Sequence, residues 1–184
     1  MNINREKIII IVQLFVIVFL IIYGYEQYST VLIHKKYVDT LAMNKLTTIE
    51  NYLQSNEELL PEITKHPSST SYVKIMQQLS HQFEQISMLS QELNDISTSL
   101  MIAKPNEINN FMSSITQKIS NFFIDNTQKD ISQSEVYSNL DRISLINKSY
   151  KDVFTNNDNK HWRTIMIEIF ILSEELANKY QKFR

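Results

Sequence analysis

The stretch IMQQLSHQFEQISMLSQELNDISTSL, residues 75–100, has the most regular apolar pattern in the chain. Two sets of residues recur there at intervals of seven. The first set, called here the heptad seam, is Leu79, Ile86, Leu93 and Leu100. The second set is Ile75, Gln82, Leu89 and Ile96. Nearly four heptads with one polar interruption are typical of a long helix with coiled-coil-like packing, which we place at 71–103.

The segments on either side also repeat their apolar residues every three or four positions, which predicts further helices. We expect one helix to end near Glu58, before a loop marked by Pro61 and Pro67. Further helices are expected from Pro105 to about 124, from about 132 to 154, and from 162 to the end. Their predicted apolar stripes are, in turn, Ile108, Phe111, Ile115, Ile119 and Phe122; Val136, Leu140, Ile143, Tyr150 and Phe154; and Trp162, Ile165, Ile169, Leu172, Leu176 and Phe183. Only Lys104 and Pro105 separate the second helix from the third, so the pattern allows either a hairpin or one kinked rod.

The composition supports an all-helical chain. The 184 residues include one glycine, three prolines and no cysteine, whereas average usage is about 7% glycine and 5% proline. Phosphate loops, nucleophile elbows and tight hairpins need residues at positive φ, which this chain hardly offers. The absence of cysteine excludes disulfides, thiolate metal sites and thiol catalysis. A net charge of -2 gives no basic surface for nucleic acid.

A long apolar run near the N-terminus indicates a membrane anchor. From Ile8 to Tyr23 only Gln13 is polar. Those residues span ~24 Å as a helix, slightly less than the ~30 Å hydrocarbon core. Flanking basic and tyrosine residues make up the difference: Arg5, Lys7, Tyr23, Tyr25 and Tyr28. We expect an uncleaved single-pass anchor; a cleaved signal peptide and a buried core helix are the alternatives.

Basic residues favour one orientation. Arg5 and Lys7 precede the run, whereas Lys35 and Lys36 are the first basic residues after it. The positive-inside rule therefore places the short tail in the cytoplasm and the following domain outside, in an inner or plasma membrane. The reverse orientation stays open. The expected organisation is a tail at 1–7, an anchor at 8–25 and a helical domain at 26–184. The fold class is all-α: one transmembrane helix continues into an elongated bundle of four or five antiparallel helices.

No constellation of residues indicates catalysis, a cofactor or a metal. Di-iron bundles need Glu three residues before His, and none of the four histidines has it: His34, His66, His81 and His161. His81 and Glu84 are expected to form a solvated contact. Adjacent carboxylates such as Glu174 and Glu175 diverge by about 100° on a helix. We therefore expect no enzyme activity, no cofactor and no metal site.

Candidate interaction residues follow from the apolar pattern. The heptad seam is longer than the neighbouring predicted helices, so we expect part of it to pair with a second copy or with another protein. Phe123 could belong to an exposed patch, although core packing is favoured. Trp162 could bind a partner, although an anchor in the core is favoured. Gln82 and Asn147 interrupt apolar stripes; they either fix register from inside the bundle or lie at its wet edge, which is the favoured reading.

Together these features favour a non-catalytic, membrane-anchored helical scaffold or interaction subunit of a cell-envelope complex. Its expected partners are the membrane and other protein subunits or a second copy, with no nucleic acid. The layout of tail, span and outer bundle resembles the four-helix sensor domains of bacterial chemoreceptors and sensor kinases. That resemblance implies the first alternative, a sensor acting through a membrane partner. The second alternative is a small inhibitor or immunity-type protein.

Overall fold

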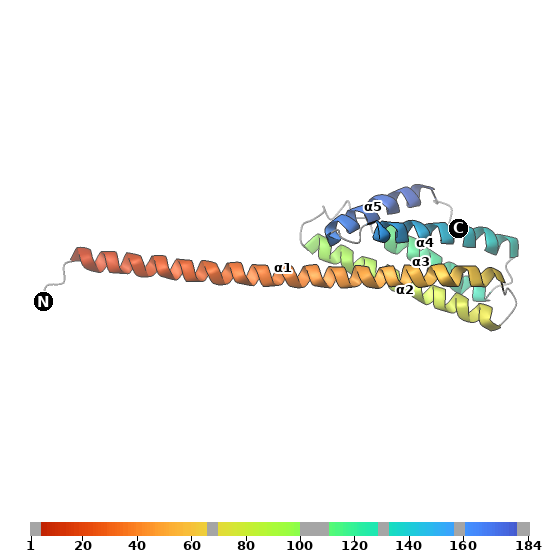
Figure 1. Cartoon of the computed structure of the whole chain (residues 1–184), viewed down its shortest axis with the longest axis horizontal. Helices are drawn as coiled ribbons and strands as arrows, with labels where there is room; N and C mark the ends of the chain where they lie inside the picture. Colours follow the sequence, from red (N-terminus) through yellow and green to blue (C-terminus); the bar gives the residue numbers. More distant parts are fainter. Residues whose placement is uncertain (1–4, 66–69, 100–110, 129–132, 157–160, 180–184) are drawn as a thin grey trace. The chain divides into compact units, whose positions relative to one another are not determined.

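The computed structural model describes the chain over residues 5–65, 70–99, 111–128, 133–156 and 161–179, and its side chains over a slightly smaller set. These residues form five helices and no strand, so the all-α prediction is confirmed for them. The helices are α1 Arg5–Lys65, α2 Thr70–Ser99, α3 Phe111–Gln128, α4 Gln133–Thr155 and α5 Trp162–Lys179 (Figure 1).

The chain divides into two units, and the division falls within α1. The N-terminal unit is Met1–Leu41 and the C-terminal unit is Ala42–Arg184. The boundary follows the contacts that the residues make, whereas the sequence-based boundary at 25/26 follows hydropathy. Each unit has its own physical character, and each is described separately below.

The end of α1 corrects the sequence prediction. The helix was expected to stop near Glu58, but it continues through Pro61 to Lys65. Proline removes one hydrogen bond to the preceding turn, which normally disfavours it inside a helix. Here the apolar spacing continues past the proline, because Leu60 and Ile63 are both buried. Burying two such side chains stabilises by roughly 3–6 kcal/mol, enough to offset the proline cost of about 3 kcal/mol.

The core of the C-terminal unit draws on all five helices. Buried residues on α1 follow the spacing 4-3-4-3-4-3 and form what we call the α1 stripe: Ala42, Leu46, Ile49, Leu53, Asn56, Leu60 and Ile63. The same spacing recurs on α4, whose predicted apolar positions are buried as expected: Val136, Leu140, Ile143, Tyr150 and Phe154. Side chains three and four residues apart share one helix face, so each helix turns a single face to the core.

The α2 and α3 helices form a hairpin, which settles the question that the sequence left open. Ser80 contacts Ser120, while Ser87, seven residues later, contacts Ser113, seven residues earlier. One position rises as the other falls, so the helices are antiparallel. Both serine hydroxyls of α2 also reach backbone carbonyls of α3, at 3.2 and 3.0 Å. Only small side chains let two helices approach this closely.

The α1 and α2 helices are antiparallel as well. Lys45 pairs with Glu92, and Ser55, ten residues later, accepts a hydrogen bond from Gln82, ten residues earlier. These two contacts define the register between the helices. For residues of α1 and α2 that lie opposite each other, the two residue numbers add up to 137.

The buried face of α3 differs from the predicted one. The predicted stripe included Ile115, Ile119 and Phe122, with Ile108 and the Phe111 side chain outside the described residues. The buried residues of α3 among those described are Met112, Thr116, Ile119, Ser120, Phe123 and Asn126. Ile115 and Phe122 are only partly buried. The buried face is rotated because α3 contacts α2 through serines. The spacing of large apolar residues does not indicate a contact made by small polar ones.

Candidate functional site

The N-terminal part of α1 exposes its apolar side chains on every side. From Val12 to Ile33 each large apolar residue is exposed, with Phe15 reaching 78%. Among the described residues, α1 is the one helix long and apolar enough to cross a membrane, and none of its apolar window is buried. This matches the predicted position of the anchor. Such a surface is too large and continuous for an ordinary water-exposed helix.

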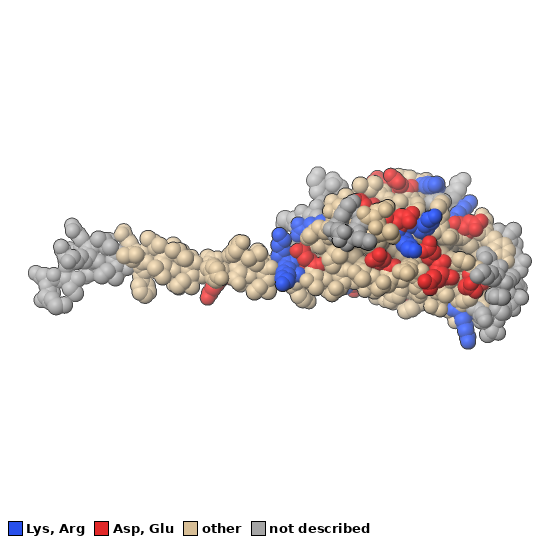
Figure 2. Space-filling view, viewed as in Figure 1, with Lys and Arg blue, Asp and Glu red and all other residues tan. Residues whose placement is uncertain are grey.

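The number of charged side chains distinguishes the Val12–Ile33 stretch from the C-terminal unit. Between Val12 and Ile33 the sequence contains one charged residue, Glu26. Figure 2 shows lysine, arginine and acidic side chains gathered over the C-terminal unit, with both signs mixed. A mixed surface of this kind is typical of a water-exposed domain.

The heptad seam lies in the core. Leu79, Ile86 and Leu93 are each 0% exposed, and Leu100 lies outside the described residues. The expectation that part of this seam would remain uncovered is wrong for the three described residues, because other helices of the same chain cover them. The predicted lengths were misleading: the α1 stripe extends to Ile63 and packs in the same core. Pairing of this helix with a second copy stays a prediction that no observation supports.

Phe123 and Trp162 are also buried. Phe123 is 0% exposed and stacks on Phe83, with ring centroids 5.9 Å apart. Trp162 is 1% exposed and begins α5, where His161 Nδ1 accepts a hydrogen bond from the Arg163 backbone N–H at 3.3 Å. A side-chain acceptor at this position caps a helix. In both residues the favoured core reading agrees with the observed burial.

Three amide side chains converge on one turn of α1. Gln82 Nε2 donates to Ser55 Oγ at 3.0 Å, and Asn147 Nδ2 donates to the Leu53 carbonyl at 2.8 Å. Asn56 lies on the same turn. All three amides are buried, and Asn56 is 0% exposed. The prediction that Gln82 and Asn147 lie at a wet edge is therefore wrong. We call Asn56, Gln82 and Asn147 the amide layer.

The amide layer is only partly hydrogen-bonded. Among the described residues, Gln82 Oε1 and Asn147 Oδ1 have no hydrogen-bond partner, and neither does either amide atom of Asn56. A buried polar group without a partner costs about 1–3 kcal/mol. Asn56 was not predicted from the sequence, although its seven-residue spacing from Ile49 and Ile63 was a usable signal.

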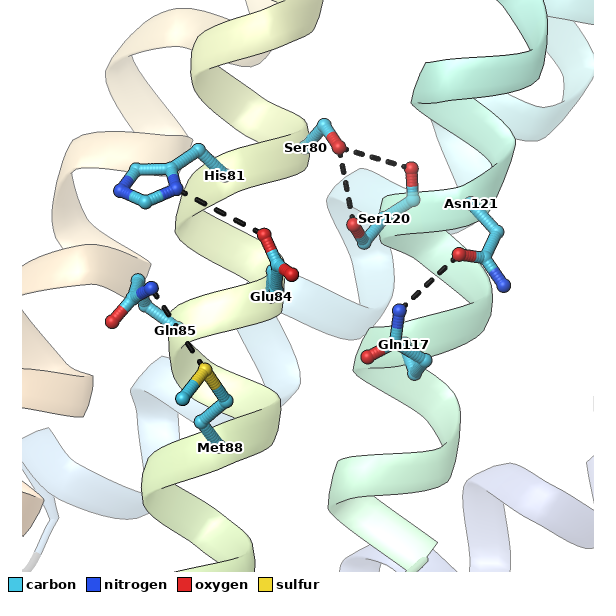
Figure 3. A network of polar contacts seen from close by, with 8 residues as sticks. All are labelled: Ser80, His81, Glu84, Gln85, Met88, Gln117, Ser120 and Asn121. Carbon is cyan, nitrogen blue, oxygen red and sulfur yellow. Dashed lines mark hydrogen bonds and ion pairs between the residues drawn. The ribbon is translucent and has the colours of Figure 1, made fainter.

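The other polar contacts on α2 and α3 lie either between the two helices or within one of them. Figure 3 shows the Ser80–Ser120 contact between the helices, and the Gln117–Asn121 and His81–Glu84 contacts within them. His81 Nδ1 and Glu84 Oε2 lie 4.0 Å apart and both side chains are exposed, as expected for a solvated contact. Within the described part of the chain, no three His, Asp or Glu side chains gather into a possible metal site.

Two further contacts tie α4 to its neighbours. The Tyr150 hydroxyl and Ser173 Oγ of α5 lie 2.9 Å apart in the core, and burial raises the pKa of Tyr150 above its ordinary value of 10.0. Lys151 pairs with Glu57 of α1 at the surface, and this hydrogen bond raises the pKa of Lys151.

An exposed apolar pair lies on α5. Ile167 and Ile171 are 55% and 51% exposed. They are four residues apart, and they face away from the buried stripe that contains Ile165 and Ile169. The sequence pattern predicted the stripe with Ile165 and Ile169, but it assigned Ile167 and Ile171 to no face.

Comparison with known proteins finds no matching family model, no matching curated protein and no matching solved structure. A functional proposal therefore rests on the residues and their geometry.

Proposed function

We propose that the chain is a non-catalytic, membrane-anchored helical bundle that acts as an interaction subunit of a cell-envelope protein complex. The observation that carries the proposal is α1. A single helix bears an all-round apolar surface from Val12 to Ile33 and a one-sided stripe from Ala42 to Ile63. The first surface suits lipid and the second suits a protein core, so one helix joins an anchor to a water-exposed domain.

The character of the C-terminal unit supports a binding role. Among the described residues its buried groups are apolar side chains, hydroxyls and amides, and no His, Asp or Glu is buried with the hydroxyls to act as a general base. Its outer surface mixes both charges and exposes Ile167 and Ile171 on one face of α5. Apolar residues that face outward on a charged surface are the usual anchors of a protein contact.

The anchor is tested by alkaline carbonate extraction of membranes that contain the full-length chain. We expect the chain to stay in the pellet with its N-terminal residues intact by mass spectrometry. A soluble form that begins near Tyr25 would show a cleaved signal and refute the anchor.

Orientation is tested by single cysteines, because the natural chain has none. A cysteine in place of the exposed Thr47 should react with a membrane-impermeant maleimide in intact cells, after removal of any outer membrane. Reaction only after lysis would place the C-terminal unit in the cytoplasm. The same approach identifies a partner: a photo-crosslinking residue at Ile171 should give a discrete adduct, while one at the exposed Gln78 serves as the matched control.

A sensor that acts through a membrane partner is the second candidate. The amide layer favours it, because unpartnered amides in a core suit a structure with more than one arrangement. A scaffold should give the same crosslinked adduct under all growth conditions. A sensor should give a different adduct, or different distances between the helices of its C-terminal unit, when conditions change.

A further inference from the structure

We propose that the outer face of α5 is the surface through which two copies of the chain pair, with their α5 helices antiparallel. This surface, called here the α5 face, consists of Arg163, Ile167, Ile171 and Glu174. The inference names the partner of the exposed isoleucines, and it therefore rests on the binding role proposed above.

The apolar part of the α5 face is exposed in the single chain. The opposite side of α5 is buried, where the helix packs on α3 and α4 at the margin of the C-terminal unit (Figure 1). Ile167 and Ile171 are each more than half exposed. Two neighbouring side chains of this size are unfavourable in water, so covering them with a second apolar surface stabilises an association.

A charged residue lies one turn beyond each end of the isoleucine pair. Arg163 precedes Ile167 by four residues, and Glu174 follows Ile171 by three. Because successive residues on a helix are about 100° apart, both charges lie on the same side of the line from Ile167 to Ile171. The two charged residues are separated by roughly 16 Å along the helix, too far to pair within one copy.

Both charged side chains can bind a partner. The Arg163 guanidinium lies over the Trp162 ring, 5.4 Å from its centroid, and among the described residues Arg163 Nε has no hydrogen-bond partner. Stacking on a ring leaves guanidinium N–H groups able to donate to a carboxylate. Glu174 is exposed and takes part in no ion pair within the described part of the chain.

An antiparallel pair of α5 helices brings these groups together. With the two-fold axis midway between Ile167 and Ile171, the numbers of facing residues add up to 338, so Ile167 of each copy faces Ile171 of the other. Arg163 then lies within one residue of the facing Glu174, on the same side, and the symmetry forms this ion pair twice. A parallel pair would instead place the Glu174 side chains of the two copies next to each other.

The other side of the α5 face also suits this arrangement. There Thr164 of one copy lies opposite Glu175 of the other, and a hydroxyl can donate a hydrogen bond to a carboxylate. Glu168, which lies further round the helix, is only partly exposed and is engaged within its own chain. The pairing therefore combines one apolar contact with complementary groups on both sides.

Charge reversal tests the pairing in the full-length chain in detergent. Arg163→Glu and Glu174→Arg each place like charges opposite one another twice. Each variant alone should therefore associate about tenfold more weakly than the parent, or weaker still, as measured by sedimentation. An equal mixture of the two variants should recover the parental association, because a mixed dimer restores both ion pairs. The double variant should recover it as a homodimer for the same reason.

A second pair of variants tests the apolar contact. Ile171→Asp should weaken association, because it places a charge among the isoleucines. Leu145→Asp is the matched control, since Leu145 is 46% exposed on α4, and it should keep the parental association. Circular dichroism checks that each variant retains its helical content.

Cysteine crosslinking tests the antiparallel arrangement without any charged substitution. The variants Ile167→Cys and Ile171→Cys should form a disulfide with each other faster than either forms one with itself, because only the mixed pair lies directly opposite. Faster crosslinking of each variant with itself would indicate a parallel pair and overturn the proposal.

A parent chain that stays monomeric at every concentration would also overturn the proposal, as would association that the charge reversals leave unchanged. The photo-crosslinking residue at Ile171 separates this inference from the proposed function. An adduct that contains a different protein would support the binding role and refute the second copy as the partner. The absence of any adduct would contradict both.

Discussion

Two stretches of α1 are both rich in apolar residues and differ in how those residues are arranged. From Val12 to Ile33 they face every side of the helix and are exposed. From Ala42 to Ile63 most of them follow the α1 stripe and are buried, whereas Met43, off the stripe, is exposed. The first arrangement needs an apolar environment all around, and the second needs one covering surface. Spacing, more than apolar content, therefore distinguishes the proposed anchor from the core helix.

The largest expected effect comes from charging the first stretch. Val16→Arg with Phe19→Arg should move the chain out of the carbonate-resistant membrane fraction, because each arginine at a helix centre raises the insertion free energy by about 2.5–3.5 kcal/mol. Thr47→Arg with Gln78→Arg adds the same charge to the exposed surface of the C-terminal unit and should leave the chain in the membrane. Retention of the Val16/Phe19 variant would show that this stretch is no anchor.

A cavity in the second stretch should have the next largest effect. Leu53 is 0% exposed, and Leu53→Ala should lower the free energy of unfolding by about 2–5 kcal/mol. Urea denaturation followed by circular dichroism measures the change. Leu20→Ala removes the same atoms from the exposed stretch and should leave the unfolding of the C-terminal unit unaffected. Equal losses at both positions would break the comparison.

The Tyr150 hydroxyl tests the polar part of the core through pH. Burial raises the folded pKa of Tyr150, so above pH 10 the unfolded chain loses this proton while the folded chain keeps it. The stabilisation is complete below pH 10.0 and is lost as pH rises, by up to about 1.4 kcal/mol per pH unit.

Tyr150→Phe removes that part of the pH dependence. At neutral pH it should lower stability by about 1 kcal/mol, through loss of the contact with Ser173. Unfolding free energies of parent and variant should therefore converge and then cross as pH rises above 10. Parallel curves would contradict the raised pKa. Tyr37→Phe, at an exposed site, is the control.

Much of the helical pattern could be predicted from large apolar residues. The α4 stripe and the burial of Ile165 and Ile169 on α5 followed from their spacing. The end of α1 could not, because Pro61 is a strong local stop signal, while the burial of Leu60 and Ile63 depends on distant helices.

The α2–α3 contact and the amide layer were harder to predict for a related reason. Ser80 and Ser87 are polar and yet lie in a close contact between α2 and α3, because their small size matters there more than their polarity. Asn56 is buried with apolar neighbours in its stripe, although its amide favours water. Local propensity describes the cost of such placements, but only the assembled core shows what compensates for it.

The smallest expected effect belongs to the Lys45–Glu92 ion pair, which borders the α1 stripe at the surface. Glu92 is half exposed, with 51% of its side chain accessible. Glu92→Gln keeps the shape and removes the charge, so it should lower the free energy of unfolding by about 0–1 kcal/mol. Salt screens exposed charges, and the difference from the parent should shrink further at 1 M NaCl. A double-mutant cycle with Lys45→Met isolates the pair from the general effect of changing net charge. A coupling well above 1 kcal/mol that persists in high salt would mean that this pair is a principal determinant of the α1 position. The position of the buried stretch would then depend on this ion pair as well as on the α1 stripe. Apolar spacing alone would no longer explain how the two parts of α1 differ.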